Sequence, residues 1–192
     1  MQQQNYYKEM SLDCMSDDDV QSFLYFKWVI EGLINKYNPP FKIDIVPAVV
    51  LDDVVAFTIG YGPFVIGYNV EMMSKDKYGI MSDAVHEFLH VWFSTYTYQE
   101  RLSIIDSVCR EAINALSDDI ALQTKYSLYM PYMYNMLVEY SFTSDITCGE
   151  EVLCELASHL KSPVRDKVFH IIIDVCVLKE DLDDLSSGLT LL

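Results

Sequence analysis

Segment 86–90 of this 192-residue chain reads His-Glu-Phe-Leu-His, a spacing of residue types that can bind and use a metal ion. Residues four apart in a helix lie on one face, so His86 and His90 can present two imidazole nitrogens to a single ion. Glu87 can reach a water on that ion and serve as general base, while the ion lowers the pKa of the water to about 7. The pattern predicts a Zn²⁺ site with His86 and His90 as metal ligands and Glu87 as the catalytic residue.

A chance arrangement on an ordinary amphipathic helix is the alternative explanation. With four histidines and 11 glutamates in the chain, about 0.005 chance occurrences of the pattern are expected. A metal-bearing helix also needs to be largely buried, and the flanking positions supply apolar faces: Val85, Phe88, Leu89 and Trp92. We therefore expect zinc to bind here.

A catalytic zinc site takes a third protein ligand and keeps one position for water. Thr147 and Glu150 have the spacing of a capping box, which would engage Glu150 with the free N–H groups of a helix end. Glu151 is then left to bind the metal, and Glu155 one turn on would orient a ligand histidine. The rival assignment has Glu155 as the ligand and His159 as its support. A solvated helix face with intrahelical pairing is the third interpretation of these residues.

The N-terminal part of the chain predicts one helix followed by a small sheet. Ser16 can cap a helix whose first turn carries three aspartates, and apolar residues at helical spacing continue it up to Asn38. Alternating β-branched and aromatic residues then predict about three strands, the last two forming an antiparallel hairpin: 42–46, 54–61 and 64–69.

The chain beyond Ser74 is predicted to be helical almost to its end. Breaks are expected near 97–101, at 130–131, over 141–149 and at 162–163. The order of helix, short sheet and helical half predicts an α+β fold. The length predicts a single domain spanning residues 1–192.

Charge and cysteine content limit the partners and the compartment. The formal net charge of −16 opposes binding to phosphate backbones and anionic lipid surfaces, so we expect no nucleic-acid and no membrane partner. Five cysteines without CxxC spacing fit neither a disulfide framework nor a cysteine-ligated zinc finger. The N-terminus has no basic region followed by an apolar stretch. A cytoplasmic protein is the expectation.

Segment 86–90 and the later Glu151–Glu155 together resemble the zincin metallopeptidases of the gluzincin type, most of all compact members such as the minigluzincins and the ImmA/IrrE-like peptidases. The resemblance covers about residues 42–161. It implies that a glutamate on a later helix completes the zinc site and that an acidic residue four positions on supports it. It also implies that the edge strand before the metal helix pairs with the substrate backbone, and the residues in that place are Phe64, Val65, Ile66, Gly67 and Tyr68.

The chain departs from this family pattern in two places. Leu89 stands where these families commonly have a small residue, so the packing of the metal helix must differ. The gap between His90 and Glu151 holds a helical insertion at about 101–140, interpreted as one or two helices rich in tyrosine and methionine. This insertion could form a substrate wall, a lid or a surface for a protein partner.

Three functional hypotheses follow. The first is a zinc metallopeptidase that hydrolyses peptide bonds of a peptide or protein substrate with a water activated by Glu87. The second is a catalytically silent, zinc-bearing interaction module, phage or mobile-element borne, whose inserted helices bind a protein partner. The third is a metal-free helical protein. Zinc stoichiometry separates the third from the others, and peptide cleavage separates the first from the second.

Overall fold

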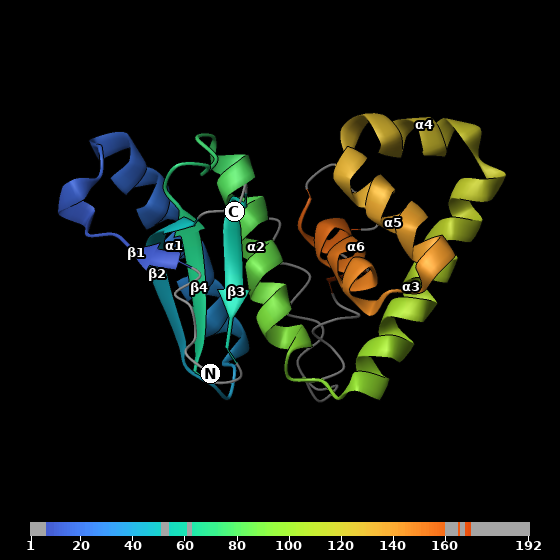
Figure 1. Cartoon of the computed structure of the whole chain (residues 1–192), viewed down its shortest axis with the longest axis horizontal. Helices are drawn as coiled ribbons and strands as arrows, with labels where there is room; N and C mark the ends of the chain where they lie inside the picture. The colour runs from blue at the N-terminus through green and yellow to red at the C-terminus, as the bar shows by residue number, and fades with distance from the viewer. Residues whose placement is uncertain (1–6, 51–53, 61–62, 160–164, 166–167, 170–192) are drawn as a thin grey trace. The chain divides into compact units, whose positions relative to one another are not determined.

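The computed structural model describes residues 7–50, 54–60, 63–159, 165, 168 and 169 (Figure 1). The chain divides into two compact units, residues 1–91 and 92–192, which are described one at a time. The first unit contains a helix and a four-stranded sheet, and the described part of the second is helical. The predicted α+β class is confirmed, while the single domain over 1–192 stays a prediction.

Helix α1 (Asp17–Tyr37) begins and ends where the sequence predicts. The Ser16 side chain accepts a hydrogen bond from the Asp19 N–H at 3.2 Å. Three aspartates occupy the first turn, where the positive end of the helix favours carboxylates. Asn38 adopts the left-handed conformation (φ 44°), and two prolines follow it, so the helix cannot continue.

The sheet has four strands, one more than predicted, in the order β1-β2-β4-β3. They are β1 (Tyr7–Glu9), β2 (Ile43–Val50), β3 (Ala56–Ile59) and β4 (Phe64–Asn69). Strands β3 and β4 form the predicted antiparallel hairpin. Strand β2 pairs in parallel with β4, and β1 pairs antiparallel with β2. The sequence missed β1 because three residues carry too little alternation to predict a strand.

Helices α1 and α2 (Lys77–Phe93) pack against the same face of this sheet. Phe26 of α1 stacks on Tyr68 of β4 with ring centroids 4.0 Å apart, and the Tyr68 hydroxyl reaches α2. Tyr37 of α1 also lies 6.2 Å, centroid to centroid, from Phe88 of α2. On the opposite face, Phe57 is buried in a cluster with two β2 side chains, Ala48 and Val50. The sheet therefore packs against α2, the helix that carries the predicted ligands His86 and His90.

The described part of the second unit contains α3 (Tyr98–Asp118), α4 (Ile120–Tyr129), α5 (Pro131–Thr143) and α6 (Ile146–Ser158). Helix α3 begins with a capping box between Thr97 and Glu100, and α5 begins at Pro131, both at predicted breaks. Three helices, not one or two, separate α2 from α6. The prediction was wrong because Asp119 has an extended backbone and ends α3 within a helical-looking sequence.

Helix α6 packs closely on α3 and α5. A Cβ added to Gly149 would lie 2.2 Å from Cγ2 of Ile105 and 2.9 Å from a ring carbon of Tyr140, so only glycine allows this approach. The helix predicted to start at Ser162–Pro163 falls mostly outside the described residues.

Candidate metal centre

Two histidines of α2 lie side by side. The Nε2 atoms of His86 and His90 are 3.0 Å apart, and the two rings lie 4.8 Å apart at an angle of 61°. Both side chains are partly buried, while Val85, Phe88 and Leu89 between and beside them are fully buried. The helix is buried along its apolar side, as predicted, and both imidazoles extend from the same helix.

The spacing of these two nitrogens fits a zinc ion. Zinc–nitrogen bonds are about 2.0–2.1 Å long. For an ion bound to both Nε2 atoms at their present separation, the N–Zn–N angle would therefore be roughly 90°. A tetrahedral angle needs the nitrogens to separate by only about 0.3 Å more, which small rotations of the rings provide. Each nitrogen must then be deprotonated, with Nδ1 carrying the proton. The donor set of two neutral imidazoles suits zinc, copper, iron or nickel rather than calcium or magnesium.

Glu87 is a buried carboxylate that a threonine of the sheet contacts. It is 7% exposed, and its Oε2 accepts a hydrogen bond from the Thr58 hydroxyl at 2.8 Å. The same hydroxyl lies 3.0 Å from the main-chain oxygen of Glu87. Thr58 belongs to β3, 29 residues earlier in the chain, and sequence reasoning missed it. A polar residue on the helix-facing side of a short strand was the only signal.

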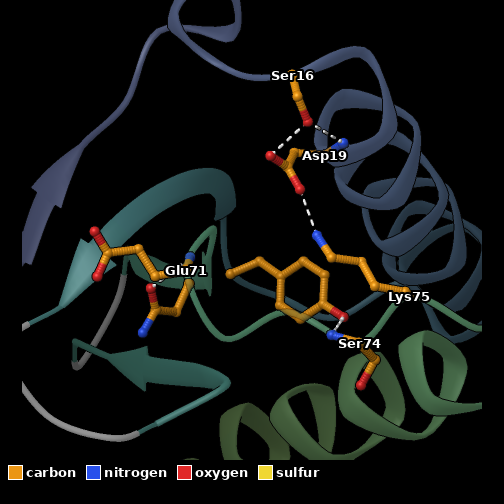
Figure 2. Close-up of polar contacts among 7 residues, drawn as sticks. Ser16, Asp19, Glu71, Ser74 and Lys75 are labelled. Atoms are coloured by element: carbon orange, nitrogen blue, oxygen red, sulfur yellow. Dashed lines mark hydrogen bonds and ion pairs between the residues drawn. The ribbon is translucent and has the colours of Figure 1, made fainter.

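Asp83 ties α2 to the sheet three residues before His86. Its Oδ2 accepts hydrogen bonds from the Tyr68 hydroxyl at 3.0 Å and from the Ser74 hydroxyl at 2.8 Å. The Tyr68 oxygen accepts the Ser74 N–H at 3.1 Å (Figure 2). Burial raises the pKa of Asp83 although both hydroxyls favour its charged form, and burial raises the pKa of Tyr68 as well. The tyrosine therefore stays protonated and donates.

The segment before α2 is also tied to α1. The Lys75 ammonium pairs with the Asp19 carboxylate, which accepts a hydrogen bond from the capping Ser16 (Figure 2). Asp76 accepts from the N–H groups of Tyr78 and Gly79 at 3.0 and 2.9 Å, so it caps the start of α2. These contacts limit the freedom of α2 relative to the sheet.

The predicted substrate-binding strand, residues 64–68, does not lie at an edge of the sheet. Strand β4 pairs with β2 on one side and β3 on the other, so Phe64, Val65, Ile66, Gly67 and Tyr68 have no free edge. Among the described strands, β1 and β3 form the two edges. The prediction failed because β2 pairs in parallel with β4 across the hairpin, a long-range pairing that local alternation does not reveal.

The start of α6 also differs from the prediction. Asp145, not Thr147, caps this helix, and its Oδ1 accepts the Thr147 N–H at 2.7 Å. Glu150 is 3.3 Å from the Arg101 guanidinium. The predicted capping box is therefore wrong, because a better-placed aspartate lies one residue before the first helical turn.

Glu151 and Glu155 lie one turn apart on α6, and both are partly buried. The residues on the apolar side of the same helix, among them Val152 and Leu156, are fully buried. His159 is the C-cap residue with an extended backbone, and its N–H bonds to the Glu155 carbonyl. Helix α6 therefore ends at Ser158, one residue before His159.

Comparison of the chain with protein-family models, curated proteins and solved structures finds no match. The zincin resemblance rests on the order of the elements and on the two short motifs.

The described helices lack the combination of length and apolar character that a bilayer crossing requires. The described cysteines, Cys14, Cys109, Cys148 and Cys154, are free thiols. Burial raises the pKa of Cys109 to about 12, so this thiol stays protonated and unreactive at neutral pH. Cys176 lies outside the described residues.

Proposed function

We propose that this protein is a zinc-dependent metallopeptidase in which His86 and His90 bind the metal and Glu87 is the general base. The observation that carries the proposal is the pair of Nε2 atoms 3.0 Å apart on a buried helix, with a buried carboxylate on the intervening turn. Two neutral imidazoles and an adjacent carboxylate supply the groups that metal-assisted hydrolysis needs.

Glu151 is the proposed third ligand. In the described part of the chain, His86, His90 and Glu151 are the group of metal-binding side chains that could hold one ion, and this supports Glu151 over Glu155. Glu155, one turn on, is proposed to orient a ligand histidine by accepting its second ring N–H. Two imidazoles and one carboxylate leave a fourth position for water.

The chemistry divides between the ion and the chain. Zinc, when bound, supplies a Lewis acid that polarises the scissile carbonyl and acidifies water. Glu87 takes the proton of the attacking water and passes it to the leaving amine. Its burial strengthens the electrostatic interactions of the carboxylate with the reacting groups, since few waters compete for it.

The proposed substrate is a peptide in extended conformation, and the proposed binding edge is β3. Phe57 and Ile59 stand opposite Gly67 and Val65, and the Asn69 N–H bonds to the Val55 carbonyl. Since antiparallel ladders bond alternate residues, the main-chain groups of Ala56 and Thr58 point away from β4. An extended peptide can bond to this edge whatever its side chains.

The test uses purified protein and the variant Glu87→Gln. We expect about one zinc per chain by elemental analysis in both, and cleavage of a peptide library by the parent alone. A variant that cuts as well as the parent refutes the mechanism. Loss of zinc in His86→Ala and in Glu151→Ala, but not in Glu155→Ala, checks the ligand set.

A zinc-bearing interaction module is the second candidate, and three exposed apolar side chains favour it: Ile120 (79% exposed), Leu128 (69%) and Phe142 (84%) on α4 and α5. A protein partner that packs on α4 and α5 would bury these side chains. Under this alternative, a chelator lowers the melting temperature of a protein that cleaves nothing.

The free cysteines support a reducing compartment such as the cytoplasm for either function.

A further inference from the structure

Thr58 makes two kinds of contact at one place in the fold. Its side chain points to the helix-covered face of the sheet, where the hydroxyl lies 2.8 Å from Oε2 of Glu87. Its main chain points the other way, to the edge of β3 that no described strand covers. One residue therefore contacts the carboxylate on α2 and also forms part of a strand edge that can accept another chain.

The hydroxyl hydrogen is more strongly attracted to the carboxylate than to the main chain. One hydrogen serves two acceptors, Oε2 and the carbonyl oxygen of Glu87. A bond to an ionised acceptor is shorter and roughly twice as strong as one between neutral groups. The shorter of the two distances, 2.8 Å against 3.0 Å, is that to Oε2. Thr58 thus holds one carboxylate oxygen of Glu87 and leaves the other, Oε1, for chemistry.

The β-branched shape of threonine matters at this position. The Thr58 side chain has a restricted χ1, and β3 is anchored to β4 by its ladder, so the hydroxyl has little freedom to move. Glu87 by contrast has three side-chain torsions and would sample several positions without this partner. Fixing it removes that freedom before the substrate arrives.

We propose that Thr58 is a positioning residue that aligns Glu87 with a substrate peptide bound along β3. The proposal rests on the peptidase function proposed above. A peptide bonded to the outward N–H and C=O of Thr58 is placed by the same residue that holds the base. The distance between the scissile bond and Glu87 is then set by Thr58 alone, not by two different parts of the fold. Losing the hydroxyl leaves the edge intact but releases the base.

The experiment compares Thr58→Val with Thr58→Ser. Valine keeps the β-branched shape and removes only the hydroxyl, while serine keeps the hydroxyl. Thr124→Val on α4 is the matched control, since it removes a threonine hydroxyl that donates to the Ile120 carbonyl at 2.9 Å. Kinetic constants, zinc content and a crystal structure are measured for each.

We expect Thr58→Val to lower kcat 10- to 100-fold, the usual loss for an outer partner of a metal-site residue, with KM changed less than about threefold. Zinc content stays at the parent value, and Glu87 adopts a different rotamer in the crystal. Thr58→Ser recovers kcat to within about threefold, and Thr124→Val matches the parent. A Thr58→Val enzyme with parental kcat overturns the proposal, as does one in which KM alone rises.

The two proposals can fail separately. If the parent binds no zinc and cleaves no peptide, the peptidase function fails. The crystal structures then decide the role of Thr58, because Glu87 should move in Thr58→Val and stay in Thr58→Ser. An unmoved Glu87 in Thr58→Val overturns the positioning role whatever the activity.

Discussion

Gly67 of β4 lies beneath the ring of Phe57, and replacing it with alanine tests the packing that holds β3 in place. A Cβ at this position would lie 2.0 Å from Cζ and 2.3 Å from Cε1 of Phe57. Ordinary contacts begin near 3.4 Å, so the ring must move by more than an ångström. The ring is 7% exposed and packs against Tyr7 at 5.0 Å between centroids, which leaves little room for that movement.

We expect Gly67→Ala to lower the free energy of unfolding by about 1–3 kcal/mol, the usual cost of overpacking a filled core. Gly32→Ala is the matched control, because a Cβ there meets nothing within 4 Å on α1. Alanine in a helix interior is more stable than glycine by about 0.5–1 kcal/mol, so this variant should gain stability. The same glycine-to-alanine change should therefore lower the free energy of unfolding at position 67 and raise it at position 32.

Urea unfolding followed by Trp28 fluorescence, in a Trp92→Phe parent, reports on the first unit. With an m value of about 2 kcal/mol/M, a loss of 2 kcal/mol moves the midpoint by about 1 M. Adding Phe57→Leu to Gly67→Ala should recover part of the loss, since the smaller side chain makes room for the new methyl group. Equal midpoints for Gly67→Ala and the parent would show that this reasoning about the ring is wrong.

Two further predictions concern the N-terminal cap of α6 and the buried carboxyl group of Asp83. Asp145→Ala should cost about 1 kcal/mol of stability through loss of the α6 cap, while Thr147→Ala should cost nothing, and the reverse order in urea unfolding would favour the capping box instead. Burial raises the folded pKa of Asp83 above its unfolded value, so between these pKa values the folded state binds more protons than the unfolded state. Stability of the parent should therefore fall as pH rises through that window, and Asp83→Asn should lack this contribution; equal slopes from pH 4 to 7 would contradict the assignment.

Local sequence rules predicted the features that depend on neighbouring residues. Ser16 and Asn38 set the ends of α1 through a side-chain cap and a left-handed backbone, both of which involve contacts within four residues. The spacing of His86 and His90 predicted a shared face, which the 3.0 Å distance confirms. The β3–β4 hairpin follows from its short connection. Each of these needs no knowledge of the rest of the fold.

The predictions that failed needed long-range information. The edge of the sheet depends on the parallel pairing of β2 with β4, which brings residue 43 beside residue 64. The partner of Glu87 depends on β3 lying under α2, and no motif in the chain links Thr58 to residue 87. The cap of α6 is the exception, because it was a local competition between two nearby side chains that spacing alone did not resolve.

Two strands hold α2 at two points, and this connects stability to the proposed chemistry. Tyr68 of β4 bonds to Asp83, and Thr58 of β3 bonds to Glu87 one turn later. Phe57 and Thr58 are neighbours in β3, and their side chains point to opposite faces of the sheet. A displaced Phe57 ring would therefore shift the strand that carries the Thr58 hydroxyl. If β3 positions the base, Gly67→Ala should reduce kcat of the folded enzyme more than Gly32→Ala does. Equal kcat values in the two variants would mean that the sheet stabilises the fold without setting the position of Glu87.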